Sequence, residues 1–136
     1  MNDNAIEREI QAKGLTAPRI TLDDIEANIV AERYFTADDG VAGAALKLAK
    51  SRGAEKISQF GWEAPESLGL LTFCVLVLKN GFTVTGESAC VSPENFDAET
   101  GRKIARQNAV AKIWPLMGYA LRDKLHTRSQ YGEAEG

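Results

Sequence analysis

The segment GESAC around Ser88 is the part of the sequence that most closely resembles a catalytic motif. In the nucleophile elbow G-x-S-x-G, the serine lies on a sharp turn between a strand and a helix. Here Cys90 stands where the motif has glycine, and the segment falls within an expected hairpin strand. The one histidine of the chain, His126, falls in the C-terminal tail, so Ser88 has no evident general base. We therefore predict no catalytic residue and expect that the protein is not an enzyme.

The basic residues near the start of the C-terminal helical region are the best candidates for ligand contacts. Arg102 and Arg106 are one helical turn apart, and with Lys103 they could bind a phosphate or an acidic partner. Asn95 and the free N–H groups at the start of a helix could add contacts to an anion. The alternative is a solvated helix face on which Glu99 pairs with Lys103 at i, i+4.

The acidic pair Asp38 and Asp39 precedes Gly40 and is typical of a turn. Residues 41–51 then have helical spacing, with Gly53 as the C-cap. Two carboxylates are fewer oxygen ligands than hard cations usually take. We therefore expect no metal site and no cofactor.

Two β-rich runs, residues 70–79 and 82–91, flank Asn80-Gly81. Asn-Gly between such runs is the strongest short-range hairpin signal, because a type I′ turn needs positive φ at both central residues. A two-residue turn would place Val77 opposite Val84, with opposed residue numbers summing to 161.

That register gives the hairpin one apolar face and one mixed face. The apolar face, expected to meet the core, carries Phe73, Val75, Val77, Phe82 and Val84. The mixed face carries Cys74, Leu76, Leu78, Thr83, Thr85 and Glu87. A mixed face is either lightly covered or an oligomer interface, so Thr83, Thr85 and Glu87 are candidates for partner contacts. Cys74 and Cys90 fall on opposite faces, which argues against a disulfide between them.

Helical patterns precede the hairpin. Residues 4–13 form either a loose arm or a short helix that ends at Gly14. Thr21, with Asp24 three residues later, resembles a capping box at the start of a helix over residues 22–34.

The C-terminal part predicts a long helix close to the hairpin. Asp97 can cap a helix whose small and apolar residues recur every four positions, and its small residues permit a close approach near Gly86. Pro115 should break or kink this helix into two segments, residues 97–113 and 115–125.

Together these patterns predict an α+β fold. An antiparallel β-hairpin or small sheet packs against a long C-terminal helix kinked near Pro115, with N-terminal helices. Residues 1–17 form a polar arm, residues 18–125 a single domain and residues 126–136 a flexible tail. A two-stranded hairpin is marginal alone, so we expect a third strand from residues 56–62 or a sheet completed across a dimer.

Composition limits the classes of function. The 136 residues carry a formal net charge of −3, which does not suit a polycation built to hold nucleic acid. No apolar run approaches the roughly 20 residues of a membrane span. Two cysteines and no secretory signal indicate the cytoplasm.

Two stretches resemble a known family of small proteins from tailed bacteriophages and prophages. They are ITLDDIEANIVAERYFTADDG and PESLGLLTFCVLVLKNGFTVTGESACVSPENFDAETGRKIARQNAVAKIWPLMGYALRDKL, which together lie between about Arg19 and Leu125. The family is named after a product of coliphage N4 and its relative in Shigella phage Sf6, and its members are called Gp49-like phage proteins. The resemblance implies a phage protein made in the cytoplasm of a bacterial host, and it implies no catalytic residues.

We therefore expect a non-enzymatic binding or inhibitor module that self-associates, with a dimer as the first expectation. It would act on a host protein or sequester a small anionic host signal such as a nucleotide. One alternative is nucleic-acid binding through Arg102, Lys103, Arg106 and Lys112, which the net acidity disfavours. A second alternative is a metal-dependent enzyme that uses Asp38 and Asp39.

Overall fold

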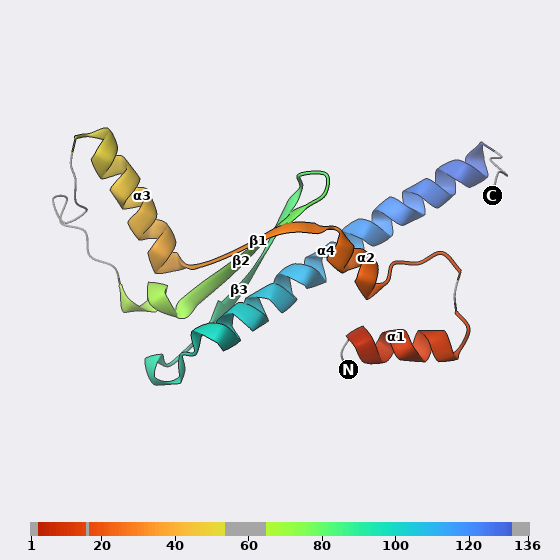
Figure 1. Cartoon of the computed structure of the whole chain (residues 1–136), viewed down its shortest axis with the longest axis horizontal. Coiled ribbons are helices and arrows are strands. Elements are labelled where there is room, and N and C mark those ends of the chain that lie inside the picture. The colour runs from red at the N-terminus through yellow and green to blue at the C-terminus, as the bar shows by residue number, and fades with distance from the viewer. Residues whose placement is uncertain (1–2, 16, 54–64, 132–136) are drawn as a thin grey trace.

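A three-stranded antiparallel sheet lies at the centre of the protein, and a long helix packs along one of its faces (Figure 1). The computed structural model describes residues 3–15, 17–53 and 65–131. The strands are β1 (Ile29–Thr36), β2 (Leu71–Leu78) and β3 (Thr83–Ala89), in the order β1-β2-β3. The helices are α1 (Asp3–Ala12), α2 (Leu22–Ala27), α3 (Ala37–Ser51) and α4 (Ala98–Gln130), with 3-10 helices at η2 (Glu66–Leu70) and η3 (Pro93–Asn95). The predicted α+β fold is confirmed.

The third strand comes from residues predicted to be helical. The capping box at Thr21 is confirmed, since the side chain accepts from Asp24 N and Asp24 accepts from Thr21 N. The helix nevertheless ends at Ala27, so the prediction of helix over residues 22–34 is wrong. Residues of β1 are mostly β-branched or aromatic, and pairing with β2 outweighs their helical spacing.

β1 therefore completes the sheet within one chain. The predicted strand at residues 56–62 lies outside the described residues. Because the sheet does not need a second copy to reach three strands, self-association stays a prediction that no longer depends on an incomplete sheet.

The hairpin turn has three residues, not two. The amide of Leu78 donates to the carbonyl of Phe82 and the amide of Gly81 donates to the carbonyl of Leu78, each at 2.8 Å. Gly81 has a φ of 90°, as expected for a type I turn closed by a glycine bulge. Val77 consequently pairs with Thr83, so the predicted register, with Val77 opposite Val84, is wrong by one residue.

A slip of one residue exchanges the two faces of a strand. The face covered by α4 carries Thr72, Cys74, Leu76, Leu78, Val84 and Gly86, all buried. Three residues predicted for the core, Phe73, Val75 and Val77, instead share the opposite face with Thr83, Thr85 and Glu87. We call this opposite face, with Ala31, Arg33 and Phe35 of β1, the open face. Phe35 and Phe73 stack on it at 5.6 Å between ring centroids.

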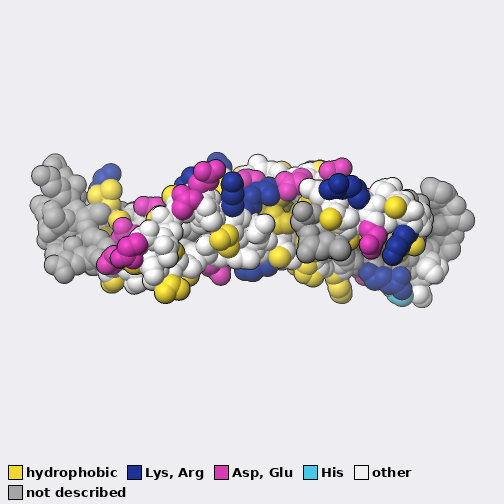
Figure 2. Space-filling view, turned by 90° about the horizontal axis from the view of Figure 1, so that it is seen from below, with side chains coloured by type: hydrophobic (Ala, Val, Ile, Leu, Met, Phe, Trp, Pro, Cys, Tyr) yellow, Lys and Arg dark blue, Asp and Glu magenta, His cyan; other side chains and the backbone are white. Residues whose placement is uncertain are grey.

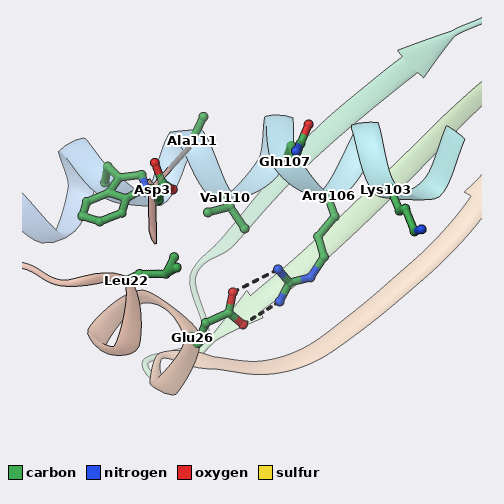
Figure 3. Close-up of a pocket in the computed structure, with 9 residues that line it drawn as sticks. Asp3, Leu22, Glu26, Lys103, Arg106, Gln107, Val110 and Ala111 are labelled. Atoms are coloured by element: carbon green, nitrogen blue, oxygen red, sulfur yellow. Dashed lines mark hydrogen bonds and ion pairs between the residues drawn. The ribbon is translucent and has the colours of Figure 1, made fainter. Parts of the chain in front are cut away.

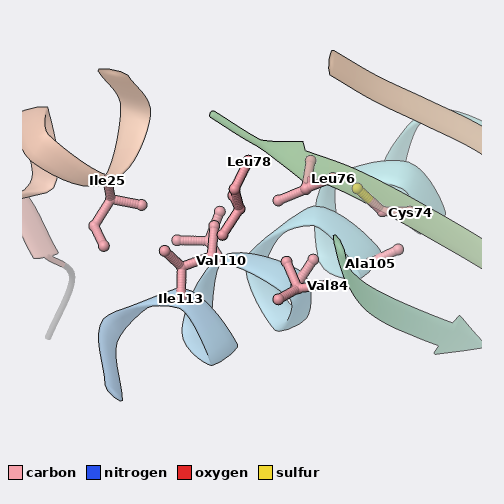
Figure 4. Packing of buried hydrophobic residues seen from close by; sticks show 9 residues of the cluster. Ile25, Cys74, Leu76, Leu78, Val84, Ala105, Val110 and Ile113 are labelled. Carbon is pink, nitrogen blue, oxygen red and sulfur yellow. The ribbon is translucent and has the colours of Figure 1, made fainter. Parts of the chain in front are cut away.

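The core lies between α4, the covered face of the sheet and α2. Side chains from these elements point toward one another in Figure 4, and the largest fully buried ones are Ile25, Leu76, Ile113 and Cys74. Burying an aliphatic side chain of this size contributes roughly 1.5–3 kcal/mol. Ile25 thereby attaches α2 to the rest of the core.

α4 approaches β3 most closely at Gly86, as the small residues of the helix predict. A Cβ atom added at Gly86 would overlap the carbonyl oxygen of Ala105 and the amide nitrogen of Ala109, and would lie 2.9 Å from the carbonyl carbon of Asn108. Ala105 and Ala109 are themselves fully buried. Only glycine on the strand and alanine on the helix permit this contact between backbones.

α4 is continuous through Pro115, so the predicted division into two segments is wrong. Proline removes the hydrogen bond to the carbonyl four residues earlier, which belongs to Ala111. Ala111 is exposed, and its carbonyl can bond to water instead. Ile113 and Met117 pack on the core on either side, which holds the helix together. α4 also includes residues 126–130 of the predicted tail.

The chain before α2 is helical from Asp3 to Ala12, the helical alternative for this region, and Gly14 follows with a φ of 68°. Arg19 donates to both carboxylate oxygens of Glu7, at 2.7 and 2.8 Å. This bidentate pair lowers the pKa of Glu7 to about 2 and joins α1 to the start of the domain.

The contact at Gly86 predicts a sharp difference between two glycine substitutions. Gly86→Ala should lower the free energy of unfolding by at least about 2 kcal/mol, because the new methyl group meets helix backbone that cannot move aside. Gly43→Ala is the matched control, since nothing lies within 4 Å of a Cβ atom there. In the interior of α3 it should raise stability by about 0.5–1 kcal/mol. Equal urea midpoints for the two variants would contradict the packing described here.

Candidate functional site

Arg106, on the face of α4 toward α2 and β1, holds two glutamates. Its Nη1 and Nη2 donate to the two carboxylate oxygens of Glu26 at 3.1 and 2.8 Å (Figure 3). Its Nε and Nη2 donate to Oε1 of Glu32 at 3.0 and 2.8 Å. All three nitrogens are thus engaged, and the guanidinium joins α4 to α2 and β1. This arrangement stabilises the fold and leaves Arg106 no free fork for an anion.

Tyr34 extends this network toward the core. Its hydroxyl donates to Oε2 of Glu32 at 2.8 Å. Hydrogen bonds from Arg106, and then from Tyr34, lower the pKa of Glu32. Burial raises the pKa of Tyr34 and also that of the Cys74 thiol, so both stay protonated. Cys74 is therefore a packed thiol, not an activated nucleophile.

A groove between α2 and α4 borders this network, and we call it the α2–α4 groove. It has a volume of about 580 Å³ and is lined by Asp3, Leu22, Glu26, Lys103, Arg106, Gln107, Val110, Ala111 and Trp114. Lys103 also pairs with Glu99 at 3.5 Å, which is the i, i+4 pair that the alternative of a solvated helix face predicts. Two acidic and two basic side chains line the groove, and both basic ones have carboxylate partners.

Of the four predicted anion contacts, the structure brings Lys103 and Arg106 to one groove and places the other two elsewhere. Arg102 lies with Thr36 and Phe96 around a small pocket near the start of α4. Asn95 lies in η3 and lines a different pocket, beside Ser88. In the pockets described for residues 3–15, 17–53 and 65–131, neither lines one together with Arg106, so the four residues are not grouped around one pocket there.

Asp38 and Asp39 lie in the first turn of α3, so the predicted turn at this position is wrong. Thr36 is the N-cap, and its side chain accepts from Asp39 N while Asp39 accepts from Thr36 N. Carboxylates in this position stabilise the helix dipole. Within the described part of the chain, no group of three or more His, Cys, Asp or Glu side chains could hold a metal ion.

A second groove lies between β3 and the C-terminal half of α4, and we call it the β3–α4 groove. It has a volume of about 690 Å³ and is lined by Phe82, Thr83, Val84, Thr85, Lys112, Pro115, Leu116 and Tyr119. Phe82, Leu116 and Tyr119 are 55%, 40% and 77% exposed. The sequence pattern placed Thr83 and Thr85 among the partner contacts, but the apolar side chains beside them were missed. An aromatic residue after Asn-Gly and another about six turns into a helix carry no signal that they share a groove.

Glu87, the remaining predicted contact, lies next to this groove on the same strand. Its carbonyl oxygen accepts from Nδ2 of Asn108 at 2.8 Å, so α4 occupies the strand edge at that residue. Its side chain lies on the open face.

Residues 20–125 match the Phage protein (N4 Gp49/phage Sf6 gene 66) family. The chain belongs to this family. No curated protein and no solved structure matches it.

For this phage-family protein, the matched region contains all three strands, α2, α3, the β3–α4 groove and the lining residues of the α2–α4 groove other than Asp3. No helix among the described residues is long and apolar enough to cross a membrane. Cys74 and Cys90 are both free thiols.

Substitutions of Arg106 and Lys103 should show that the half-buried ion pairs of Arg106 contribute more to stability than the exposed ion pair of Lys103. Arg106→Met should lower the free energy of unfolding by about 1–3 kcal/mol, because it removes charge-assisted hydrogen bonds and leaves Glu32 half-buried without its cation. Lys103→Met, which removes only the exposed pair with Glu99, should change it by less than about 0.5 kcal/mol. Urea unfolding of both variants measures the difference, and equal losses would contradict the assignment.

The ion pair between Arg106 and Glu32 also predicts how the free energy of unfolding depends on pH. The pKa of Glu32 is lowered in the folded protein, so its contribution is complete above the ordinary glutamate pKa of about 4.3 and is lost as the pH falls through the folded value. Arg106→Met removes this contribution, so the stability difference between wild type and variant should narrow as the pH falls from about 7 to about 3. A difference that stays constant over this range would show that the carboxylate of Glu32 is not held by Arg106.

Proposed function

We propose that this member of the phage family is a non-enzymatic accessory protein that binds a host protein in the cytoplasm of the infected bacterium. The observation that carries the proposal is the β3–α4 groove, where Phe82, Leu116 and Tyr119 gather around one hollow. Single exposed apolar residues are ordinary, but several in one groove are typical of interaction sites. Aromatic residues are enriched in protein interfaces because they bury a large area at a small entropic cost.

A small anionic ligand is supported less well. Tight sequestration of a nucleotide needs uncompensated positive charge or free N–H donors facing the phosphates. In the α2–α4 groove, Arg106 already holds Glu26 and Glu32, and Lys103 pairs with Glu99. Asp3 also lines that groove and would repel a phosphate.

Nucleic-acid binding is the alternative function, and the surface charges support it less than protein binding. A backbone-binding surface needs several uncompensated Lys or Arg side chains along one track. On the face drawn in Figure 2, Lys and Arg side chains alternate with Asp and Glu side chains and form no continuous basic strip. Arg106, one of the residues predicted for this role, faces two carboxylates.

Capture from host lysate tests the proposal when matched variants are compared. Immobilised wild-type protein should retain a host protein that the Leu116→Asp variant does not retain. The substitution replaces an apolar side chain of the β3–α4 groove with a carboxylate, and burying a carboxylate against the partner is unfavourable. We expect the affinity of the captured protein to fall by about tenfold or more, equivalent to about 1.4 kcal/mol. Mass spectrometry identifies the protein, and titration with the purified partner gives the affinity.

Leu48→Asp provides the control for a general effect of adding a charge. Leu48 is an exposed apolar residue of α3, which lies away from the C-terminal half of α4 (Figure 1). A partner lost equally from both variants would count against the groove. Capture that disappears on nuclease treatment would favour the nucleic-acid alternative. Recovery of the same host proteins by the wild type, Leu116→Asp and Leu48→Asp would leave the proposal without support.

A further inference from the structure

β3 is one of the two outer strands of the sheet, and its free edge borders the β3–α4 groove. The amide of Leu78 donates to Phe82 O, and the amide of Cys90 donates to Leu70 O. These bonds show that even-numbered positions of the strand direct their backbone groups toward β2. Backbone direction alternates along a strand, so Thr83 and Thr85 direct their N–H and C=O groups away from the sheet.

Part of this edge is already occupied by α4. At Glu87, the next position that faces outward, the side chain of Asn108 donates to the carbonyl oxygen. The segment from Thr83 to Thr85 is left with outward backbone groups that no described strand pairs. It contains no lysine, no proline and no bulge, which are the usual protections of an edge strand.

The open edge and the apolar groove together fit one kind of occupant, an extended polypeptide. A strand added beside Thr83 and Thr85 would receive their backbone hydrogen bonds. Every second side chain of that strand would point to the same side of the sheet as α4 and enter the groove beside Leu116 and Tyr119. Affinity then comes from the backbone, and selectivity comes from the alternate side chains.

A second copy of this chain does not fit the edge. Antiparallel pairing of two β3 strands about a two-fold axis puts both α4 helices on the same face of a continuous sheet. α4 lies directly against Gly86 of β3, so the two helices would have to share the space beneath two adjoining strands, which lie about 4.8 Å apart. Packed helix axes need about 8–10 Å. Parallel pairing of two β3 strands would need a two-fold axis along the strands. Each residue would then lie opposite its own copy, with the two side chains on opposite faces of the sheet. The pleat does not allow this, because the side chains of paired residues point to the same face.

We infer that the β3–α4 groove binds an extended segment of the partner by strand addition to the Thr83–Thr85 edge. The segment carries apolar side chains at alternate positions and an acidic side chain close to Lys112. Lys112 is the one charged residue among the described residues that line the groove, and it has no carboxylate within 4.0 Å in the described part of the chain. The inference rests on the proposed function and specifies how the partner is recognised.

A random library of short linear peptides, selected on the folded full-length protein, supplies the probe. We expect the enriched sequences to alternate apolar and polar residues and to contain a carboxylate. Thr85→Pro should weaken the binding of a synthetic enriched peptide by about tenfold or more, because proline removes the outward N–H that the added strand requires. Thr85→Val is the matched control, because it keeps that N–H and the β-branched shape, and it should bind as the wild type does.

Leu116→Asp separates failure of the inference from failure of the proposed function. Loss of peptide binding in Leu116→Asp but not in Thr85→Pro would overturn strand addition and leave a groove that binds protein in another way. Binding that neither substitution affects would place the peptide elsewhere and count against both. A library that yields no alternating sequence would also overturn the inference.

Hydrogen exchange provides a measurement that does not depend on whether Thr85→Pro folds. In wild-type protein, the amides of Thr83 and Thr85 point outward and should exchange rapidly. Saturation with the enriched peptide should slow their exchange by about tenfold or more if they bond to an added strand. Unchanged exchange at both amides, with peptide bound, would overturn the inference.

Discussion

The contact between Gly86 and the backbone of α4 is the constraint on which the rest of the structure depends. No side chain separates strand from helix there, so α4 lies directly beneath β3. That position brings Val110 and Ile113 to the core and sets Leu116 and Tyr119 beside the hairpin tip. It also decides what can add to the edge of the sheet, since a second helix has no room beneath a neighbouring strand.

Arg106 is a predicted ligand contact that instead forms ion pairs within the fold. On an isolated helix, an arginine with basic neighbours resembles an anion site. In the folded chain, Glu26 and Glu32 come from two other elements and engage all three of its nitrogens. A half-buried guanidinium held by two carboxylates contributes to the position of α2 and β1. The consequence for function is that Arg106, although it lies in the most basic part of the sequence, offers no free pair of donors to an anion.

The two sides of the hairpin therefore differ in what they offer a partner. On the α2 side, charged groups satisfy one another around the α2–α4 groove. On the β3 side, apolar side chains, an uncompensated lysine and an unpaired strand edge lie together in the β3–α4 groove. Those three properties are the basis for the proposal that this member of a phage family recognises a host polypeptide.

The sequence by itself determined the local features that depend on near neighbours. The capping box of α2 follows from Thr21 and Asp24, the N-cap of α4 follows from Asp97, and the hairpin follows from Asn80-Gly81, because each needs only a few adjacent residues. The family resemblance likewise needed only the order of residues. None of these signals distinguishes a two-residue turn from a three-residue turn around the same glycine.

Tertiary structure decided what depends on distant partners. Residues 29–36 form a strand beside β2 despite their helical spacing. Pairing of their backbone groups with β2 and burial of one face outweigh a weak local preference for helix. One extra turn residue shifted β2 by one position against β3, which exchanged the two faces of β2 and moved Phe73, Val75 and Val77 out of the core. Continuity of α4 through Pro115 was decided by packing on both sides of it. The candidate site has the same origin, because Phe82, Leu116 and Tyr119 become neighbours only when the helix lies against Gly86.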